Sequence, residues 1–394
     1  MRLQDHSPNP RPFGPPRHGQ SADTGAVRRP VSPRKAILTT VGLVVTLAAA
    51  VVVAEAQYVS YAASSLRQAA GVTPATELSH PAEVIDQDAQ SLTLLAAGDI
   101  ADCPMRPGLA KVFPTTAHLL GLPSAFDLSD VAASKTAALA ENWPDAPILA
   151  LGDLVYNSGT PAEFSDCFDR IWSGLKDRTL PTPGNHEYAT PDAFGYYDYW
   201  GDRAGPDRRG YYAMETASWL IVSLNSEVAA GPGSDQSLWL QDQLDAAPDK
   251  CVLAFYHKPA HSLRRRGDSE DALALFRQLQ DNGATAVLNG HNHFYERTYP
   301  LDAAGHPDLA TGTRAFTVGS GGRVSKVRPT VATTEEAIFQ TTGLLRLELG
   351  ARRYHWWYHD AETGAVLDTG AAACNPARPA PEAELTAQAQ LPSE

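Results

Sequence analysis

Short apolar runs that each close on a polar residue recur between residues 91 and 293. They are "SLTLLAAGDI", "APILALGDLVY", "RTLPTPGNHEY", "WLIVSLNSE", "CVLAFYHKP" and "ATAVLNGHNH". A short β-rich run bounded by Gly, Asp or Asn predicts a buried strand followed by a loop. Helical patterns lie between several of these runs, at 162–175, 237–244 and 268–282. Strand, polar loop and helix in repeated order predict an α/β fold, with the polar loops at equivalent ends of one sheet.

The pattern changes after Thr313, where strands replace the alternation with helices. The stretch "LLRLELGARRYHWWYHDAETGAVLDTG" predicts a meander with turns at Gly350-Ala351 and at residues 362–364. These later strands need a place beside the earlier ones, so we expect them to contribute to a second sheet.

Composition places the chain among globular proteins. With 394 residues, of which 43% are hydrophobic and 20% charged, it can bury a sizeable core in one large domain with appendages. The net charge of −13 is unevenly distributed, because residues 1–35 hold seven basic and two acidic side chains. The acidic remainder argues against a general nucleic-acid binder. Seven prolines and little apolar pattern predict that residues 1–35 form a disordered arm.

Residues 36–54 form an uncharged run of nineteen residues between Arg34-Lys35 and Glu55. This length meets the roughly 18 residues needed to cross a bilayer, while Ala54-Glu55-Ala56 also fits a signal-peptide cleavage site. A membrane anchor and a secreted protein cleaved near residue 56 are both open, and both leave the later residues outside the cytoplasm. We expect a basic cytoplasmic arm, an anchor or signal peptide, a linker, a folded domain and a disordered tail at 1–35, 36–56, 57–90, 91–374 and 375–394.

The polar residues at the strand ends form one candidate site when they are taken together. Any one of them could be turn chemistry or a structural histidine. Five successive loops that offer oxygen or nitrogen donors at equivalent ends of one sheet would be an unlikely accident. In chain order these residues are Asp99 in "GDIADC", Asp153 and Tyr156 in "GDLVYNSG", Asn185 and His186 in "GNHEY", His257 in "FYHKP", and His291 and His293 in "GHNH".

With these motifs the sequence resembles the calcineurin-like metallophosphoesterases, and within them the purple acid phosphatases. The family pattern of Asp-x-Gly, Gly-Asp-x-x-Tyr, Gly-Asn-His-Asp/Glu, a strand-end His and Gly-His-x-His is present as "DIA", "GDLVY", "GNHE", "FYH" and "GHNH". The extension "GHNHFYER" is similar to plant purple acid phosphatases. Ala101 stands where the wider superfamily often has a metal-binding His, and Tyr156 would fill that vacancy. The resemblance covers residues 93 to about 372 and implies a four-layer α/β/β/α sandwich for the catalytic domain.

The resemblance also implies two metal ions bridged by Asp153. Asp99, Tyr156 and His293 would complete one metal site, and Asn185, His257 and His291 the other. A tyrosine with an ordinary pKa of about 10 binds as phenolate only to a strong Lewis acid, which favours Fe(III) beside Tyr156. The neutral donors of the other site suit Zn(II), Fe(II) or Mn(II).

The implied activity is hydrolysis of phosphomonoesters by a water that the two metal ions activate. His186 is the candidate to hydrogen-bond the phosphate of a small phosphorylated substrate and to protonate the leaving alkoxide. His261, four residues after His257, is a second candidate to reach the substrate. "VGSGG", residues 318–322, lacks the Lys-Ser/Thr pair and the following helix of a P-loop, so we interpret it as a turn that closes a strand near the site.

Two other functions remain alternatives. A phosphodiesterase or nucleotide phosphohydrolase would use the same ligands, because these fix the metals and not the substituents on phosphorus. A non-catalytic, membrane-tethered binding module conflicts with the retention of every expected ligand. The sequence leaves the oligomeric state open.

The four cysteines allow three disulfide connectivities. Cys103 and Cys167 follow the first two motifs, whereas Cys251 begins a strand and Cys374 ends the last β element. We therefore expect the pairs 103–167 and 251–374. Four reduced thiols would be preferred only in a cytosolic domain.

Overall fold

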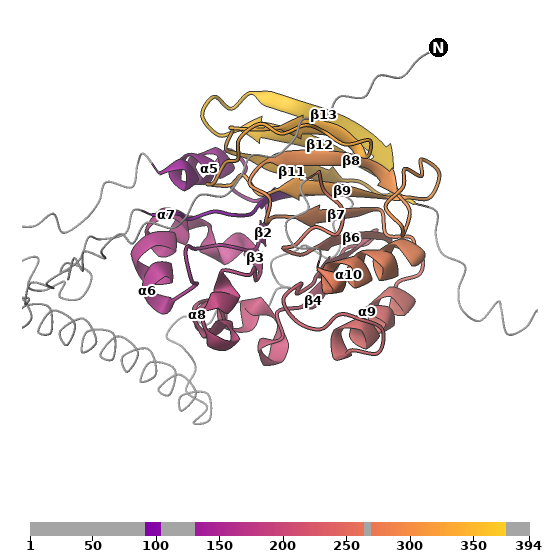
Figure 1. Ribbon diagram of the computed structural model, residues 1–394, viewed down its shortest axis with the longest axis horizontal. Helices are drawn as coiled ribbons and strands as arrows, with labels where there is room; N and C mark the ends of the chain where they lie inside the picture. The colour runs from indigo at the N-terminus through magenta and orange to yellow at the C-terminus, as the bar shows by residue number, and fades with distance from the viewer. Residues whose placement is uncertain (1–90, 104–130, 264–268, 376–394) are drawn as a thin grey trace, which may run out of the picture. The chain divides into compact units, whose positions relative to one another are not determined.

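The computed structural model describes residues 91–103, 131–263 and 269–375, which contain two mixed β-sheets (Figure 1). The six-stranded sheet has the order β13-β12-β11-β1-β2-β3 and the seven-stranded sheet the order β10-β8-β9-β7-β6-β5-β4. The strands of the first sheet are β1 (Leu92–Ala97), β2 (Ile148–Leu151), β3 (Thr179–Thr182), β11 (Gly343–Leu349), β12 (Arg353–Asp360) and β13 (Val366–Ala373). Those of the second are β4 (Tyr212–Glu215), β5 (Trp219–Ser223), β6 (Cys251–Phe255), β7 (Ala286–Asn289), β8 (Tyr295–Leu301), β9 (Thr313–Val318) and β10 (Thr334–Ile338).

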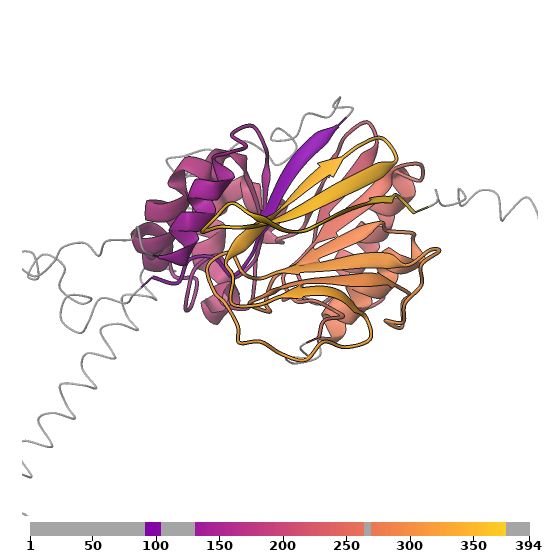
Figure 2. The ribbon, with the colours of Figure 1, turned by 90° about the horizontal axis from the view of Figure 1, so that it is seen from above.

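Helices cover the outer face of each sheet (Figure 2). The helices α5 (Ala132–Ala140), α7 (Asp169–Trp172) and α8 (Phe194–Trp200) share an apolar cluster with the six-stranded sheet, and the short α6 (Pro161–Glu163) precedes α7. On the other side, α9 (Asp235–Ala246) and α10 (Glu270–Asp281) share a cluster with the seven-stranded sheet. A third cluster, between the sheets, joins side chains such as Leu94 and Leu347 to Leu253 and Phe316. These layers confirm the predicted α/β/β/α sandwich.

Helix α10 illustrates how local sequence produces an element. The Ser269 side chain accepts a hydrogen bond from the Ala272 N–H, which satisfies one of the free donors at the helix start. Ala272, Leu275, Phe276 and Leu279 follow the helical repeat and are buried. The predicted helices at 237–244 and 268–282 are thus confirmed as α9 and α10, while residues 161–178 form a run of short α, π and 3-10 turns.

The expectation that all polar loops lie at the end of one sheet is wrong. The strands β1, β2 and β3 belong to the six-stranded sheet, whereas β5, β6 and β7 belong to the seven-stranded sheet. The late meander confirms the predicted turns, but β11 pairs antiparallel with β1 and so joins the first sheet instead of building a second. Apolar runs reveal strands but not their partners, because pairing depends on residues distant in the sequence.

Both predicted disulfides are confirmed. Cys103 and Cys167 are bonded with their Cα atoms 5.9 Å apart, and Cys251 and Cys374 with theirs 5.7 Å apart. The second bond ties the start of β6, in one sheet, to the residue after β13, in the other. Disulfides persist in oxidising compartments, which favours an extracytoplasmic location.

The predicted arm, anchor or signal peptide and linker at 1–35, 36–56 and 57–90 lie outside the described residues, as does the tail from residue 376. Within the described ranges, no helix combines the length and apolar character needed to span a membrane.

Candidate metal centre

The predicted donors lie in loops that directly follow the strands of both sheets. Asp99 follows β1, Asp153 follows β2 and Asn185 lies just beyond β3 in the first sheet. His257 and His291 follow β6 and β7 in the second sheet. The two sheets therefore each contribute polar strand ends to one region, as the contacts below show.

Three of these residues have an unusual backbone conformation. Asp99, Asp153 and His291 have φ angles of 57°, 50° and 68°. Side-chain-bearing residues rarely adopt positive φ, which costs on the order of 1–3 kcal/mol each and is maintained where the surrounding structure enforces it. This conformation occurs at three predicted donors of the same centre. It therefore indicates a functional constraint on the direction in which their side chains point.

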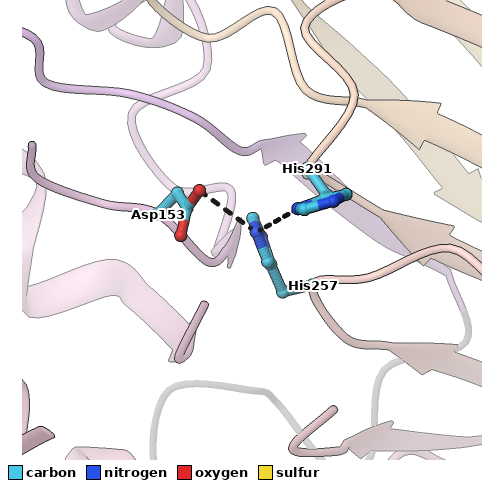
Figure 3. A group of neighbouring side chains, drawn as sticks. All are labelled: Asp153, His257 and His291. Atoms are coloured by element: carbon cyan, nitrogen blue, oxygen red, sulfur yellow. Dashed lines mark hydrogen bonds and ion pairs between the residues drawn. The ribbon is translucent and has the colours of Figure 1, made fainter. Parts of the chain in front are cut away.

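Asp153, His257 and His291 converge closely enough to hold a metal ion. One ligand atom from each lies within 4.8 Å of the others. Figure 3 shows His257 between the other two, with its Nε2 atom 3.2 Å from Asp153 Oδ2 and 3.2 Å from His291 Nδ1. His257 Nδ1 lies 2.9 Å from the Leu151 carbonyl oxygen, so Nδ1 carries the proton and Nε2 is the nitrogen directed at the centre.

A second group of donors lies on the other side of Asp153. Tyr156 Oη donates to Asp99 Oδ1 over 2.8 Å, and His293 Nε2 lies 3.1 Å from the same oxygen. Tyr156 Oη is also 3.3 Å from Asp153 Oδ2, the oxygen that contacts His257. The Asp153 carboxylate therefore touches both groups of donors.

Asn185 joins the histidine group. Its side-chain Oδ1 lies 3.3 Å from His257 Nε2, the same nitrogen that faces Asp153 and His291. The structure thus brings together all seven predicted metal ligands, in two groups that share Asp153: Asp99, Tyr156 and His293 in one, Asn185, His257 and His291 in the other.

The electrostatics of the centre fit a cation. Burial disfavours the charged form of Asp153, but the neighbouring His257 and His186 outweigh it and hold the pKa of this carboxyl below its usual range. Burial likewise disfavours the charged form of His257, yet Asp153 raises its pKa to about 10. Burial, Asp99 and Asp153 all raise the pKa of Tyr156. Positive charge is favoured here, and bound metal ions would supply it in place of protons.

Glycines provide the space that the donors need. A Cβ atom on Gly184 would lie 2.3 Å from Asp153 Oδ1, and one on Gly290 would lie 2.8 Å from Asp99 Oδ2. Any side chain at these positions would displace the carboxylates. The glycines of "GNH" and "GHNH" therefore let the backbone pass close to the two carboxylates. This close packing supports the fit of the site to metal ions.

Glu187 supports the candidate site, and the sequence analysis did not single it out. Its buried carboxylate accepts hydrogen bonds from the backbone N–H groups of Gly184 (2.7 Å), Leu154 (2.8 Å) and Asp153 (2.9 Å). Burial, followed by the charge of Asp153, raises its pKa to about 8. Glu187 ties the loop after β2 to the loop after β3 and so holds Asp153 and Asn185 together. Its place in "GNHE" was the only signal, because its partners lie 32 to 34 positions earlier or within its own loop.

His186 lies at the centre. Its backbone N–H donates to Asp153 Oδ1 over 2.9 Å, and its ring Nδ1 lies 2.6 Å from the Asn157 carbonyl oxygen. The ring Nε2 is 3.8 Å from Asp153 Oδ2, and the side chain is 29% exposed. His186 therefore combines contact with the donors and access to solvent.

His261 has a different environment. Its ring meets Phe276 of α10 edge-on, with the ring centroids 4.8 Å apart. A Cβ atom on Gly305 would lie 2.5 Å from His261 Cε1, so the ring also packs on the backbone between β8 and β9. These contacts describe a packed side chain, and a catalytic role for His261 stays an untested prediction.

Comparison with known proteins agrees with this geometry. Residues 92–295 match the family model of the calcineurin-like phosphoesterases. Two uncharacterized proteins from strains of Mycobacterium tuberculosis are each 31% identical over a 205-residue alignment, which covers 43% of this chain and 37% of theirs. The chain therefore matches well under half the length of these curated relatives.

Solved structures share the fold at low identity. A purple acid phosphatase from yellow lupin (Lupinus luteus) superposes with a TM-score of 0.58 at 13% identity, over 73% of this chain and 54% of that one. GAP50, described as the anchor in the inner membrane complex of Plasmodium, superposes with a TM-score of 0.53 at 13% identity, over 77% and 96%. The fold thus occurs in both a phosphatase and an anchor, so the donors decide the chemistry. The family match spans just over half of the 394 residues and contains every predicted donor, and the chain belongs to the calcineurin-like phosphoesterases.

Proposed function

We propose that the protein is a phosphatase of the purple acid type, which hydrolyses phosphomonoesters with two metal ions bridged by Asp153. One observation carries the proposal: Asp153 Oδ2 lies 3.2 Å from His257 Nε2 and 3.3 Å from Tyr156 Oη, one donor from each group. A carboxylate between two donor sets can bridge a pair of cations about 3.5–4 Å apart.

The donor chemistry favours two different metals. Asp99, Tyr156 and His293 include a carboxylate and a phenol, which suit Fe(III) once the phenol ionises. Asn185, His257 and His291 are neutral and suit Zn(II), Fe(II) or Mn(II). When bound, the cations would supply Lewis acidity, which draws charge from the phosphoryl oxygens and makes water a nucleophile near neutral pH.

His186 would protonate the leaving alkoxide. The Asn157 carbonyl holds the Nδ1 side of the ring, which leaves Nε2 directed toward Asp153 and partly open to solvent. An imidazole can carry the proton that the departing oxygen needs. The backbone bond from His186 to Asp153 keeps this ring in register with the donors.

The location proposed for this activity is outside the cytoplasm. The two disulfides support it, and residues 36–54 would either anchor the chain or be removed with a signal peptide. A phosphodiesterase or nucleotide phosphohydrolase would use the same donors, so hydrolysis of matched monoesters and diesters decides between these activities.

Replacement of His186 by Gln tests its proposed role. Loss of a general acid costs roughly 10²–10⁴-fold in rate, and the loss should be greater for an alkyl phosphate than for a nitrophenyl phosphate, whose leaving group needs no proton. We expect this divergence in kcat, with metal content unchanged. His306→Gln is the control, because this ring is 77% exposed. Equal losses on both substrates would rule out general-acid catalysis by His186.

A further inference from the structure

The glycine-rich segment after β9 fixes one arginine beside the candidate centre. The Gly321 N–H donates to the Gly98 carbonyl over 2.9 Å, and the Arg323 N–H donates to the Asp99 carbonyl over 3.1 Å. A Cβ atom on Gly322 would lie 1.8 Å from the Ile100 oxygen, so only glycine permits this close approach. The segment is the predicted turn that closes a strand, and it holds Arg323 against the loop that carries Asp99.

The Arg323 side chain lies over a predicted metal ligand. Its guanidinium carbon is 3.6 Å from the centroid of the Tyr156 ring, within the range of a cation–π contact. Its Nε atom donates to Asp102 Oδ2 over 2.8 Å, and Nη2 has a long contact of 3.4 Å to Asn157 Oδ1. The side chain is 24% exposed. Asp102 thus orients the group through Nε, while Nη2 makes only the long contact to Asn157.

Arg323 and His186 both contact Asn157 and Tyr156. The Asn157 carbonyl oxygen contacts His186 Nδ1 at 2.6 Å, while the Asn157 side chain contacts Arg323. The His186 ring also meets the Tyr156 ring, with their centroids 4.5 Å apart. The fixed guanidinium is therefore separated by a single residue from the histidine that is proposed to meet the substrate. It provides a local positive charge in a protein whose net charge is −13.

We propose, on the basis of the function proposed above, that Arg323 binds the substrate phosphate and favours dianionic monoesters over monoanionic diesters. A planar guanidinium presents paired N–H donors that match two phosphate oxygens. A monoester has one more ionised oxygen than a diester, so it gains more from this cation. A phosphate oxygen would replace the weak contact of Nη2 to Asn157 and accept a hydrogen bond from it. The hydrogen bond from Nε to Asp102 would remain.

The experiment compares kcat/KM for an aryl phosphate monoester and the matching aryl diester. A hydrogen bond between charged groups is worth about 1.5–3 kcal/mol, which corresponds to roughly tenfold to a hundredfold. We expect Arg323→Gln to lose that factor on the monoester and much less on the diester, and to weaken inhibition by inorganic phosphate. Arg323→Lys keeps the charge without the fork and should lie between.

Matched controls come from the same segment. Lys326→Gln and Arg328→Gln remove one positive charge each from exposed positions and should leave the ratio of the two activities unchanged. Metal content and melting temperature of every variant show whether the centre is intact. Equal losses on both substrates, or a ratio that also falls in the two controls, would mean that Arg323 braces Tyr156 or acts only through net charge, and would overturn the inference.

The outcome for Arg323 is separable from that of the proposed function. If the wild-type protein hydrolyses neither substrate, the proposed phosphatase activity fails. Calorimetric titration with inorganic phosphate then decides the inference, because a dissociation constant unchanged by Arg323→Gln would contradict phosphate binding by this residue.

Discussion

Tyr156 is the predicted ligand on which the assignment of iron rests. Its hydroxyl is buried against Asp99 and Asp153, and burial together with these two carboxylates raises its pKa. Arg323 over the ring opposes this effect but does not reverse it. A phenolate at this position therefore needs a strongly acidic cation, which is why the metal proposed beside it is Fe(III).

Tyr156→Phe tests this assignment. A phenolate bound to Fe(III) gives a visible charge-transfer colour, so the wild-type protein should be purple or pink and the variant colourless. Loss of one anionic donor should also weaken iron binding, while Asn185, His257 and His291 retain the divalent ion. Absorption spectra and metal analysis measure both effects. Tyr199→Phe, which also removes a hydroxyl bonded to an aspartate, should keep the colour. A colourless, iron-free and active wild-type protein would exclude Fe(III).

At the scale of single residues, the sequence identifies the predicted metal ligands but not the residues that hold their loops in place. Asp153, His257 and His291 are recognisable because each ends an apolar run. Glu187 and Arg323 are not, because their roles depend on loops that are adjacent only in the folded chain: Glu187 bonds the loop after β2, and Arg323 bonds the loop after β1. His261 has the right spacing from His257 but packs against Phe276, which spacing alone does not reveal.

At the scale of elements, a buried carboxylate links the two sheets. Asp368 of β13 accepts hydrogen bonds from Tyr295 Oη (2.7 Å) and Arg297 Nε (2.8 Å), both on β8, and from Trp356 Nε1 (3.1 Å) on β12. Strand β8 begins two residues after His293, so this contact fixes the strand that leaves the last donor loop. Arg297 has a structural role here, because its guanidinium pairs with the carboxylates of Asp368 and Glu335.

Asp368→Asn should destabilise the fold in a pH-dependent way. Burial disfavours ionisation of Asp368, but the hydrogen bonds from Arg297 and Tyr295 outweigh it and hold its pKa below the usual range. The carboxylate therefore adds stability above the unfolded-state pKa of about 3.9, and this contribution is lost as the pH falls through the folded value. Hydrogen bonds to a charged group are worth about 1.5–3 kcal/mol, so we expect a loss of that order at neutral pH and a smaller one near pH 3.

Denaturant unfolding at the two pH values measures this difference in the free energy of unfolding. Asp242→Asn on α9 is the control, because this carboxylate is exposed and should have little effect at either pH. A variant as stable as the wild type at neutral pH would show that the link between β8 and β13 contributes nothing.

The elements themselves were largely predictable, but their assembly was not. Alternating apolar positions identified β11, β12 and β13 with their turns, because strand period and turn residues are local properties. The helix α5 was missed because nothing in "AASKTAALA" marks its start: Val131 at its N-cap makes no side-chain bond to the helix. The division of the donor strands between two sheets depends on β1 pairing with β11, some 250 residues later.

At the scale of the whole molecule, the structure combines a site assembled from both sheets with disulfides that hold its framework. Cys103–Cys167 ties the loop beyond Asp99 to the helical turns after β2, and Cys251–Cys374 joins the two sheets. Both would survive in an oxidising compartment, in accord with the proposed activity outside the cytoplasm. We propose that this framework holds two metal ions on which hydrolysis depends.

Metal analysis of the purified protein, paired with hydrolysis of an aryl phosphate, tests that claim most directly. We predict two metal ions per chain, one of them iron, with activity lost on chelation and regained when both metals are restored. Asp153→Asn should bind less of both metals and show no turnover, because the bridging charge is gone, while Asp242→Asn should match the wild type. Folded, metal-free protein that hydrolyses the ester at an undiminished rate, or Asp153→Asn protein with two metals and normal turnover, would contradict the account.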